Sequence, residues 1–455
     1  MGYITGNYEN FLQPNTSMDA VDNLKQKRNT TVHIMRISVI GTGYVGSVTG
    51  ACLAERGHDI IFVGRNKNKL ELIKSGKSPI YEPGLKDLLQ KNRKKISVTT
   101  DLPDAIAQSD ITFICVGTPP KKDGSSDLSQ VKEVSRMIGK SLRSIDRFHV
   151  VVTKSTVIPG TNENVILPIL EKESKKRAYT DFGLASNPEF LKEGTAIDDF
   201  FHTDRVVIGT NDPKTQQILE TLYKPLNAQI FSTTLRTSEM IKYASNAFLA
   251  TKISFANEIG NLCKNLGIDS YEVFKGVGLD VRINPHFFRS GIGFGGSCFP
   301  KDVRALIAHA DSKGIPSGIL SSVMALNEDQ PKRLVDLLKK HILPKGKTIG
   351  ILGLSFKPDT DDIRESRAIP IIRRLRKAGA SVIVYDPMAM KNFKQVIPDI
   401  TYADSASEVL AADAVLIVTE WKEFENLDYR NKIIIDGRRI EKAQKEAAVY
   451  EGVCW

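Results

Sequence analysis

Blocks of hydrophobic residues, separated by small and polar residues, predict an α/β fold for this chain. Within residues 36–65, an apolar run at 37–40 predicts a buried strand, residues 51–56 belong to a helix, and residues 59–63 predict a second strand. A strand, a helix and a strand in this order form one βαβ unit.

Two later apolar runs, in residues 109–120 and 148–161, predict further strands that end in small and turn-forming residues. In a doubly wound sheet, the carboxyl ends of the strands line the ligand crevice. Thr118, Ser155 and Thr156 follow such ends, so we expect their hydroxyl groups to bind a cofactor or a substrate. Each of them taken alone is more often the hydroxyl of an ordinary turn.

The same arrangement recurs towards the C-terminus. A strand and a glycine turn open the segment KTIGILGLSFKPDT, while KAGASVIVYDP parallels ERGHDIIFVGR and EVLAADAVLIVTE parallels AIAQSDITFICVGT. Between the two regions, residues 233–268 carry apolar residues at helical spacing, with no glycine or proline before Gly260. That segment therefore predicts one long helix.

We predict an α/β protein in which two Rossmann-like doubly wound domains are joined by a central helical domain with a long helix. The second of these domains lacks the full glycine fingerprint of the first. The expected parts are a disordered N-terminal extension (1–34), a dinucleotide-binding domain (35–230), the central helical domain (231–328) and the second Rossmann-like domain (329–455).

The segment GTGYVG suits a strand-to-helix turn that binds dinucleotide phosphates. Gly41 permits a tight turn, Gly43 lets a pyrophosphate approach the backbone, and Gly46 lets the helix pack closely on the strand. All three glycines are expected in the turn, together with Tyr44 and Val45, and the following helix directs its positive end at the phosphates. We therefore expect a nicotinamide dinucleotide here; a packing turn without a ligand is the alternative.

The end of the second strand departs from the usual NAD pattern. An acidic residue is expected there to bind the ribose 2′-hydroxyl, but the chain has Gly64 and Arg65. Without the carboxylate a 2′-phosphate is not repelled, and Arg65 can pair with it. We expect NAD as the cofactor, with NADP also accepted; the alternative is that Arg65 is a solvated loop residue.

Composition and charge limit the partners. The chain of 455 residues is 41% hydrophobic and 25% charged, and its net charge of +10 comes from basic residues dispersed among 53 acidic ones, so we expect no nucleic-acid partner. Its five scattered cysteines form no CxxC pair, so neither a disulfide framework nor a metal site is expected. With no signal peptide and no long apolar run, we expect a cytoplasmic protein without a membrane partner.

Three polar residues stand at helical spacing in the predicted long helix. Glu239, Lys242 and Asn246 fall at i, i+3 and i+7, so the lysine and the amide share one face. On the residues alone, a solvated pair is the commoner explanation. Upstream, Glu189 and Glu193 are expected one helical turn apart near a helix start, where acidic residues are common because of the helix dipole.

Cys298 lies in GFGGSCFPKD, behind glycines that allow backbone to lie close to a ligand and ahead of Lys301 and Asp302. Three interpretations are open for this cysteine. A metal ligand lacks partner residues at suitable spacing. A lone cysteine is most often a small buried side chain, and the third possibility is a nucleophile.

Six motifs in this order resemble the nucleoside-diphosphate-sugar 6-dehydrogenases, the UDP-glucose/GDP-mannose dehydrogenase family. The resemblance covers nearly all of residues 36–455. The motifs are GTGYVG, KSTVIPGT, NPEFLKEGTA, EMIKYASNAFLATKISFANEI, GFGGSCFPKD and FKPDTDDIRES.

The resemblance implies a four-electron oxidation that turns the sugar C6 alcohol into a carboxylate. Cys298 would then be the nucleophile that captures the aldehyde as a thiohemiacetal and carries the thioester. The remaining catalytic residues implied are Lys242 and Asp302 beside the reacting carbon, Asn246 at the oxyanion, Glu189 positioning the hydrolytic water, and Thr156 assisting it. Lys242 is either a base or an electrostatic stabiliser, and both roles stay open here.

The resemblance also implies binding residues for both ligands. The central domain would carry dimerisation and catalysis, and the last domain would bind the UDP-sugar. Implied cofactor contacts beyond the glycine turn are Glu193 at the nicotinamide and Arg364 reaching across a subunit boundary. The implied substrate contacts are Glu189, Phe190, Leu191, Lys242, Asn246, Arg282, Phe287, Phe288, Arg289, Gly291, Gly295, Lys357 and Arg438.

Two alternatives to the favoured substrate and activity stay open. UDP-glucose, giving UDP-glucuronate, is favoured over GDP-mannose as substrate. A protein of another class, which binds a nucleotide-sugar without catalysis, is disfavoured because binding alone needs no thiol. The family further implies a homodimer or a higher homo-oligomer, with which a long helix is consistent.

Overall fold

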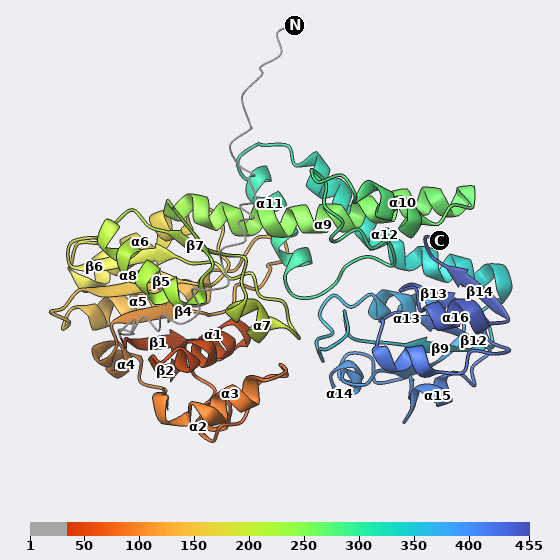
Figure 1. Cartoon of the computed structure of the whole chain (residues 1–455), viewed down its shortest axis with the longest axis horizontal. Coiled ribbons are helices and arrows are strands. Elements are labelled where there is room, and N and C mark those ends of the chain that lie inside the picture. The colour runs from red at the N-terminus through yellow and green to blue at the C-terminus, as the bar shows by residue number, and fades with distance from the viewer. Residues whose placement is uncertain (1–33) are drawn as a thin grey trace, which may run out of the picture. The chain divides into compact units, whose positions relative to one another are not determined.

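A computed structural model of the chain describes residues 34–455. The predicted disordered extension over residues 1–34 lies, apart from Ile34, outside the described residues. The expected α/β architecture is confirmed: two parallel sheets, each covered by helices, are separated along the chain by a helical region (Figure 1). The domain boundaries at 230 and 328 stay predictions.

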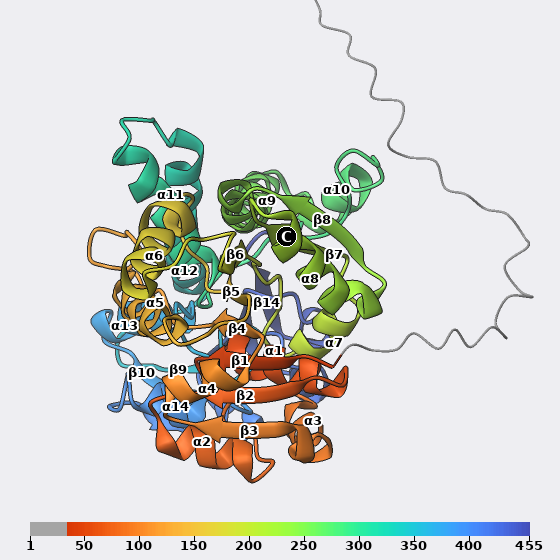
Figure 2. The same ribbon diagram turned by 90° about the vertical axis from the view of Figure 1, so that its left-hand side faces the viewer.

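The first sheet has eight strands in the order β3-β2-β1-β4-β5-β6-β7-β8. Its pairs are parallel except β6 with β7. Figure 2 shows the strands following one another from β8 to β3. The strands are β1 (Arg36–Ile40), β2 (Asp59–Val63), β3 (Ile96–Thr99), β4 (Ile111–Ile114), β5 (His149–Thr153), β6 (Phe182–Ser186), β7 (Arg205–Gly209) and β8 (Gln229–Thr233).

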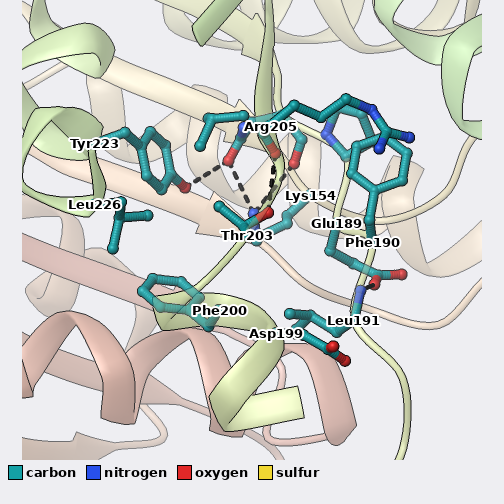
Figure 3. A pocket seen from close by; sticks show the side chains of 13 residues that line it. Lys154, Glu189, Phe190, Leu191, Asp199, Phe200, Thr203, Arg205, Tyr223 and Leu226 are labelled. Carbon is teal, nitrogen blue, oxygen red and sulfur yellow. Dashed lines mark hydrogen bonds between the residues drawn. The ribbon is translucent and has the colours of Figure 1, made fainter. Parts of the chain in front are cut away.

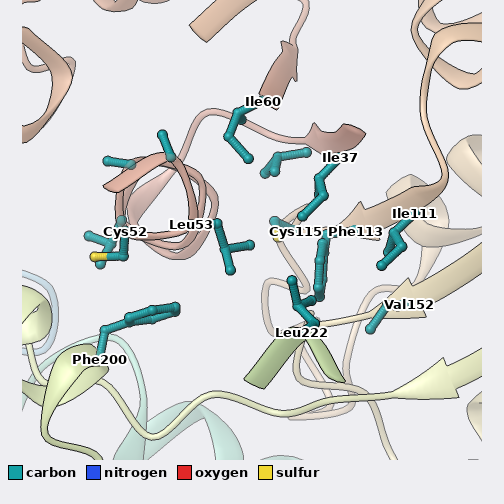
Figure 4. Close-up of a cluster of buried hydrophobic side chains, with 14 of the residues drawn as sticks. Ile37, Cys52, Leu53, Ile60, Ile111, Phe113, Cys115, Val152, Phe200 and Leu222 are labelled. Carbon is teal, nitrogen blue, oxygen red and sulfur yellow. The ribbon is translucent and has the colours of Figure 1, made fainter. Parts of the chain in front are cut away.

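Helices cover both faces of this sheet, so its strands read as continuous apolar runs. On one face, Leu53 of the helix after β1 and Leu222 pack near Ile37 and Phe113 of the strands (Figure 4). The helices are α1 (Tyr44–Glu55), α2 (Lys67–Lys74), α3 (Leu85–Lys91), α4 (Leu102–Gln108), α5 (Ser129–Leu142), α6 (Leu167–Ser174), α7 (Ala196–Phe201) and α8 (Pro213–Tyr223).

The turn between β1 and α1 explains two of the three glycines of the fingerprint. Gly41 has φ +110, and a Cβ there would lie 2.6 Å from the Cys115 carbonyl oxygen. Gly46 lies within the first turn of α1 rather than in the connecting turn, which corrects the sequence prediction. A Cβ on Gly46 would lie 1.9 Å from the Gly41 oxygen, so close helix-strand packing excludes any larger residue.

The predicted long helix is confirmed as α9 (Leu235–Leu266), drawn in green in Figure 1. It continues through Gly260, where a Cβ would lie 2.8 Å from Cys454 Cβ and 2.9 Å from Ser290 Cβ. Close packing therefore accounts for a helix-weakening residue at this position. The other helices of this region are α10 (Ser270–Val277), α11 (Phe299–Asp311) and α12 (Gly318–His341).

The second sheet has six strands in the order β11-β10-β9-β12-β13-β14, all parallel. Its order repeats that of the first six strands of the first sheet, so the predicted relation between the two regions is confirmed. Its strands are β9 (Thr348–Leu352), β10 (Ser381–Tyr385), β11 (Thr401–Tyr402), β12 (Ala414–Ile417), β13 (Ile433–Asp436) and β14 (Val449–Gly452). Its helices are α13 (Ala368–Lys377), α14 (Met390–Lys394), α15 (Ala406–Val409) and α16 (Glu441–Glu446).

Among residues 34–455, no helix combines the length and the hydropathy that crossing a bilayer requires.

Candidate active site

Cys298 stands at the N-terminus of α11, partly exposed, with its Sγ 3.6 Å from the Ser297 hydroxyl. Burial raises the pKa of the Cys298 thiol. The positive charge of Lys242 lowers that pKa, whereas the carboxylates of Glu189 and Asp302 raise it. The thiol is therefore protonated in the resting protein, and Lys242, together with the Ser297 hydroxyl, favours the thiolate.

Lys242 and Asn246 point into the protein from α9, with relative exposures of 4% and 6%. This burial rules out the solvated pair that the sequence alone favoured. The Lys242 Nζ donates to the Glu189 carbonyl oxygen (2.7 Å) and to its carboxylate Oε1 (3.1 Å). Burial lowers the pKa of Lys242, but Glu189, Cys298 and Asp302 raise it to a net value above the ordinary one, so this lysine is an ammonium ion.

Asp302 is held one turn into α11 and is 1% exposed. The Asn246 Nδ2 donates to its Oδ2 at 2.6 Å, and Lys301 pairs with its other oxygen. The carboxylate thus has a partner on each oxygen, as a buried charge requires. Together with Cys298 and Lys242, these side chains form one buried cluster between α9 and α11.

Glu189 follows the carboxyl end of β6 in an irregular segment, and the next helix, α7, begins only at Ala196. The predicted helical spacing of Glu189 and Glu193 is therefore wrong, because contacts with distant residues, such as Lys242 and Glu82, fix this segment. Burial raises the pKa of Glu189, but the charge of Lys242 and the backbone N–H of Leu191 lower it to a net value below normal. This carboxylate is ionised in the resting protein.

Glu193 bridges the first sheet region to the second one. Its Oε1 accepts from the Ser297 hydroxyl and from Arg364 Nη2, each at 3.2 Å. Burial and the negative charge of Asp362 raise the pKa of Glu193 to about 7. The contact between Arg364 and Glu193 is made within one chain. The cofactor contact of Arg364 across a subunit boundary stays a prediction.

The N-terminus of α1 lies free of side-chain caps and has no acidic residue in its first turn. A Cβ on Gly43 or on Gly117 would meet open space, so both positions leave room beside the turn. The Thr118 hydroxyl donates to the Thr156 carbonyl oxygen at 2.8 Å. The Ser155 hydroxyl contacts the carbonyl oxygen of Val116 at 2.6 Å, so the ends of β4 and β5 meet beside the glycine turn.

Glu82 is a residue that the sequence analysis missed, although it is 5% exposed. Its carboxylate accepts from the Tyr44 hydroxyl and from the backbone N–H groups of Gly194 and Ala196, the latter two at 2.7 Å. It thereby ties the glycine turn to the segment that follows Glu193. Its position in the sequence, within the loop YEPG, gave no signal because the partners are more than 35 residues away along the chain in either direction.

The end of β2 leaves Arg65 in solvent, with 77% of its side chain exposed and a 3.3 Å ion pair to Glu133. An exposed pair of this kind contributes about 0–1 kcal/mol. Arg65 is therefore free to exchange Glu133 for another anion. A Cβ on Gly64 would lie 3.2 Å from the Thr42 hydroxyl, beside the same turn.

Of the expected substrate residues, Phe190 lies beside the cluster, and Lys357 and Arg438 lie in the second sheet region. Arg205 lies over the Phe190 ring at 4.1 Å, and the Lys242 Nζ is 5.4 Å from the same ring centre. Burial lowers the pKa of Lys357, while Glu193 counteracts that shift, so Lys357 lies near Glu193. Arg438 donates to the Val418 carbonyl oxygen (2.7 Å).

The glycines before Cys298 bring the loop against the second sheet region. A Cβ on Gly291 would lie 2.7 Å from the Gly437 oxygen, and one on Gly295 would lie 2.4 Å from the Glu365 oxygen. Gly293 and Gly296 have φ values of +90 and +83. The loop can follow this path only with glycine at these positions.

Of four other expected substrate residues, three are exposed and one packs on an aromatic ring of α10. Arg282 is 85% exposed in its side chain and bonds Asp280, while Arg289 and Phe287 are also exposed. Phe288 is buried, but it stacks on Phe274 with ring centres 5.0 Å apart.

The Glu189 segment also lines a pocket in which Lys154 is buried at 5% exposure (Figure 3). Lys154 belongs to the motif KSTVIPGT, but it was not among the predicted site residues. A lysine that directly follows an apolar strand was the available signal, because strand ends of a covered sheet are buried.

Comparison with known families gives three matches along the chain. The models describe the UDP-glucose/GDP-mannose dehydrogenase family: its NAD binding domain matches residues 35–227, its central domain 236–329 and its UDP binding domain 350–443.

Individual relatives are similar over nearly the whole chain. UDP-glucose 6-dehydrogenase of Haloferax volcanii is 45% identical over 92% of this chain and 100% of the relative. GDP-mannose 6-dehydrogenase of Pseudomonas aeruginosa is 40% identical over 92% of this chain and 100% of the relative. The solved structure of a UDP-glucose dehydrogenase from Pyrobaculum islandicum has a TM-score of 0.90 at 44% identity, covering 94% of this chain and 99% of that one.

Proposed function

Because the chain belongs to the UDP-glucose/GDP-mannose dehydrogenase family, we propose that it oxidises UDP-glucose to UDP-glucuronate through a covalent intermediate on Cys298. It is an NAD-dependent oxidoreductase that acts on a CH–OH group. The observation that supports the covalent route is one partly exposed thiol beside a buried ammonium ion and two buried carboxylates, Glu189 and Asp302.

The turn after β1 fits a dinucleotide. The α1 N-terminus has no side-chain cap, and Gly43 and Gly117 leave open space beside it, so backbone N–H groups are free to bind a pyrophosphate. Tyr44 and Glu82 hold the turn against the segment that follows Glu193. Nicotinamide dinucleotides bound here in succession would supply the hydride acceptors, one for each of the two oxidations.

In the first oxidation the sugar C6 alcohol loses a hydride from carbon and a proton from oxygen. Lys242, as an ammonium ion, stabilises negative charge on that oxygen and is not the base, because its pKa is raised. Asp302 is the carboxylate that takes up the proton, and Asn246 keeps Asp302 in place.

In the second oxidation the carbon is held by the protein. The Cys298 sulfur bonds to the aldehyde carbon while its proton passes to the aldehyde oxygen, which gives a thiohemiacetal. Loss of a second hydride and the hydroxyl proton gives a thioester. Glu189, assisted by Thr156, then takes a proton from water; the water oxygen bonds to the carbon and the C–S bond breaks, which releases the carboxylate and restores Cys298.

GDP-mannose is the second candidate substrate, because a GDP-mannose 6-dehydrogenase is similar over the same share of the chain. We favour UDP-glucose because the relative from Haloferax volcanii and the structure from Pyrobaculum islandicum, both UDP-glucose dehydrogenases, are more similar. NADP is proposed as an accepted second cofactor, since Gly64 places no carboxylate near a 2′-phosphate and Arg65 lies exposed beside it.

A second copy of the chain is the proposed partner. Phe248, Phe255 and Leu262 recur every seven residues on α9 and are 65%, 49% and 55% exposed. Residues at this spacing lie along one side of a helix, as in helix pairs. All five cysteines are free, which suits a reducing compartment, and we propose the cytosol.

Purified protein with each nucleotide-sugar and each cofactor tests the function. We expect two reduced cofactors for each UDP-glucuronate formed, followed by nicotinamide absorbance and product mass. Cys298→Ser should bind both ligands yet turn over very slowly, because a serine ester hydrolyses less readily. Glucuronate formation by that variant at the wild-type rate would contradict the covalent route, and silence with every nucleotide-sugar would indicate a binding protein.

A further inference from the structure

Lys154 carries a charge in the interior of the first sheet region, directly after β5 (Figure 3). Its Nζ donates to Asn187 twice, to the carbonyl oxygen at 3.3 Å and to the side-chain Oδ1 at 2.9 Å. It also lies 5.8 Å from the ring centres of Phe113 and Tyr223. Burying an ammonium ion here costs free energy of hydration, which an apolar side chain of similar volume would avoid. The presence of a lysine therefore indicates that its charge has a function.

Asn187 connects Lys154 to the segment that carries Glu189. Its side-chain Nδ2 donates to the Val207 carbonyl oxygen (2.8 Å), and its Oδ1 also accepts from the Tyr223 hydroxyl (2.5 Å). Its backbone N–H donates to Thr153 (2.9 Å). Asn187 therefore connects β5, β7 and α8 at a position two residues before Glu189.

The charge of Lys154 reaches Glu189. Together with Lys242, it lowers the pKa of the Glu189 carboxylate. The other titratable groups around Lys154 are Lys242, whose charge lowers the pKa of Lys154, the Cys115 thiol at the end of β4, the Tyr223 hydroxyl on α8, and Asp199 and Arg205 in the same pocket.

We propose that Lys154 is a positioning residue for thioester hydrolysis, which fixes the Glu189 segment through Asn187 and keeps the Glu189 carboxylate ionised. The proposal rests on the function proposed above. The two cations reach Glu189 differently: Lys242 contacts the Glu189 carboxylate directly and also favours the Cys298 thiolate, whereas Lys154 contacts Asn187 of the same segment. Loss of Lys154 should therefore slow the hydrolytic half of the reaction and spare both hydride transfers.

The experiment compares wild type with Lys154→Met in the full chain with UDP-glucose and NAD. We expect the variant to release two reduced cofactors per active site in a fast burst and then to turn over on the order of tenfold more slowly. Intact mass should show the sugar-nucleotide acyl group on Cys298 during turnover. The acid limb of its kcat profile should move to higher pH, since the pKa of Glu189 rises without the Lys154 charge.

Tyr223→Phe is the matched control, because it removes a hydrogen bond from the same Asn187 oxygen and leaves the charge in place. Its acid limb should stay at the wild-type pH. A Lys154→Met protein that folds, by circular dichroism, and shows neither burst, nor acyl group, nor shifted limb would overturn the proposal. Equal slowing of the first hydride transfer would overturn it as well.

Lys154→Arg gives a second measurement that does not depend on the methionine variant. An arginine stays charged, so this variant should keep the acid limb of the kcat profile at the wild-type pH and should not accumulate the acyl group on Cys298. An acid limb of Lys154→Arg at higher pH would overturn the role of the charge. If the wild type oxidises no nucleotide-sugar at all, the proposed function fails, whereas wild-type turnover with unchanged variants overturns only the inference about Lys154.

Discussion

The two glycine turns of this protein stand at equivalent places in two sheets of the same strand order, yet their backbones are satisfied differently. After β1, Gly41 has φ +110 and the chain enters α1 at once, with no side-chain cap. After β9, Gly353 has φ +96, and the chain runs through a loop before α13 begins. The Asp386 carboxylate accepts from the N–H groups of Leu354 (2.7 Å) and Ser355 (3.0 Å) in that loop.

Asp386 follows β10 at the place that Gly64 holds after β2. It also accepts from Trp421 Nε1 and from the N–H groups of two residues further along its own loop. The second turn therefore contains its own anion, while the first leaves room for one from a ligand. The longer second loop carries Arg364, which reaches Glu193 of the first region. The same strand order thus supports a cofactor site in the first sheet region. In the second sheet region it supports a loop whose Arg364 reaches Glu193.

The largest effect should follow from giving the first turn an anion of its own. Gly43→Asp fits without a clash, since a Cβ there meets open space, and its carboxylate can cap α1. It would then occupy the N–H groups and repel the pyrophosphate. We expect the dissociation constant for NAD to rise about a thousandfold, roughly 4 kcal/mol, measured by calorimetry. Gly43→Asn, which caps without charge, should weaken binding less; equal weakening would contradict the electrostatic explanation.

Removing the anion from the second turn should lower the stability of the protein and leave its affinity for the cofactor unchanged. Asp386→Ala leaves several buried N–H groups without an acceptor, so we expect the free energy of unfolding to fall by about 3 kcal/mol in denaturant titrations. Asp386→Asn keeps one oxygen and should lose less. If Asp386→Ala instead weakened NAD binding at unchanged stability, the assigned difference between the turns would be wrong.

Lowering the pH should destabilise the first sheet before the second. His149 is buried in β5, with Nε2 2.8 Å from the Thr112 hydroxyl and Nδ1 2.9 Å from the Ser109 oxygen, whereas no histidine lies in β9 to β14. Burial lowers the pKa of His149 to about 4, below the value of about 6.5 for the unfolded chain. The unfolded state therefore binds the extra proton between these values, and about 2–3 kcal/mol of stability is lost as pH falls from 6.5 to 4.

Hydrogen exchange at pH 7 and at pH 4.5 checks this order by comparing peptides from β5 with peptides from β12. We expect earlier loss of protection in β5, and a smaller pH effect in His149→Gln. Loss of protection in β12 first would show that another group governs acid unfolding.

The smallest effect concerns Arg65, which stands beside Gly64 at the place of Pro387 in the second region. Arg65→Gln should lower kcat/KM with NADP about tenfold and leave the value with NAD nearly unchanged, because the 2′-phosphate loses an ionic partner. Lys67→Gln, another exposed change nearby, serves as the control. A strong preference of the wild-type protein for NAD would contradict this role and indicate that Arg65 is a solvated loop residue.

The strands, the long helix and the glycine turn could be predicted because each is encoded by neighbours in the sequence. Apolar runs set β1 and β2, and helical spacing without a break set α9. The candidate site could be named only through its resemblance to a family, since Lys242, Glu189 and Cys298 are far apart along the chain. Helical spacing gave a wrong prediction for Glu189 and Glu193, because a local pattern does not report the contacts with distant residues that hold that segment outside a helix.

The sequence by itself therefore determined which segments form strands and helices, where the dinucleotide turn lies and which family motifs occur. Only the tertiary structure decided that Lys242 and Asn246 are buried, that Asp386 fills the second turn, and that Lys154 and Glu82 hold the segments beside Glu189 and Glu193. The physical reason is that burial, charge and hydrogen bonding depend on which distant segments meet. A carboxylate or an ammonium ion acquires its chemistry from those partners.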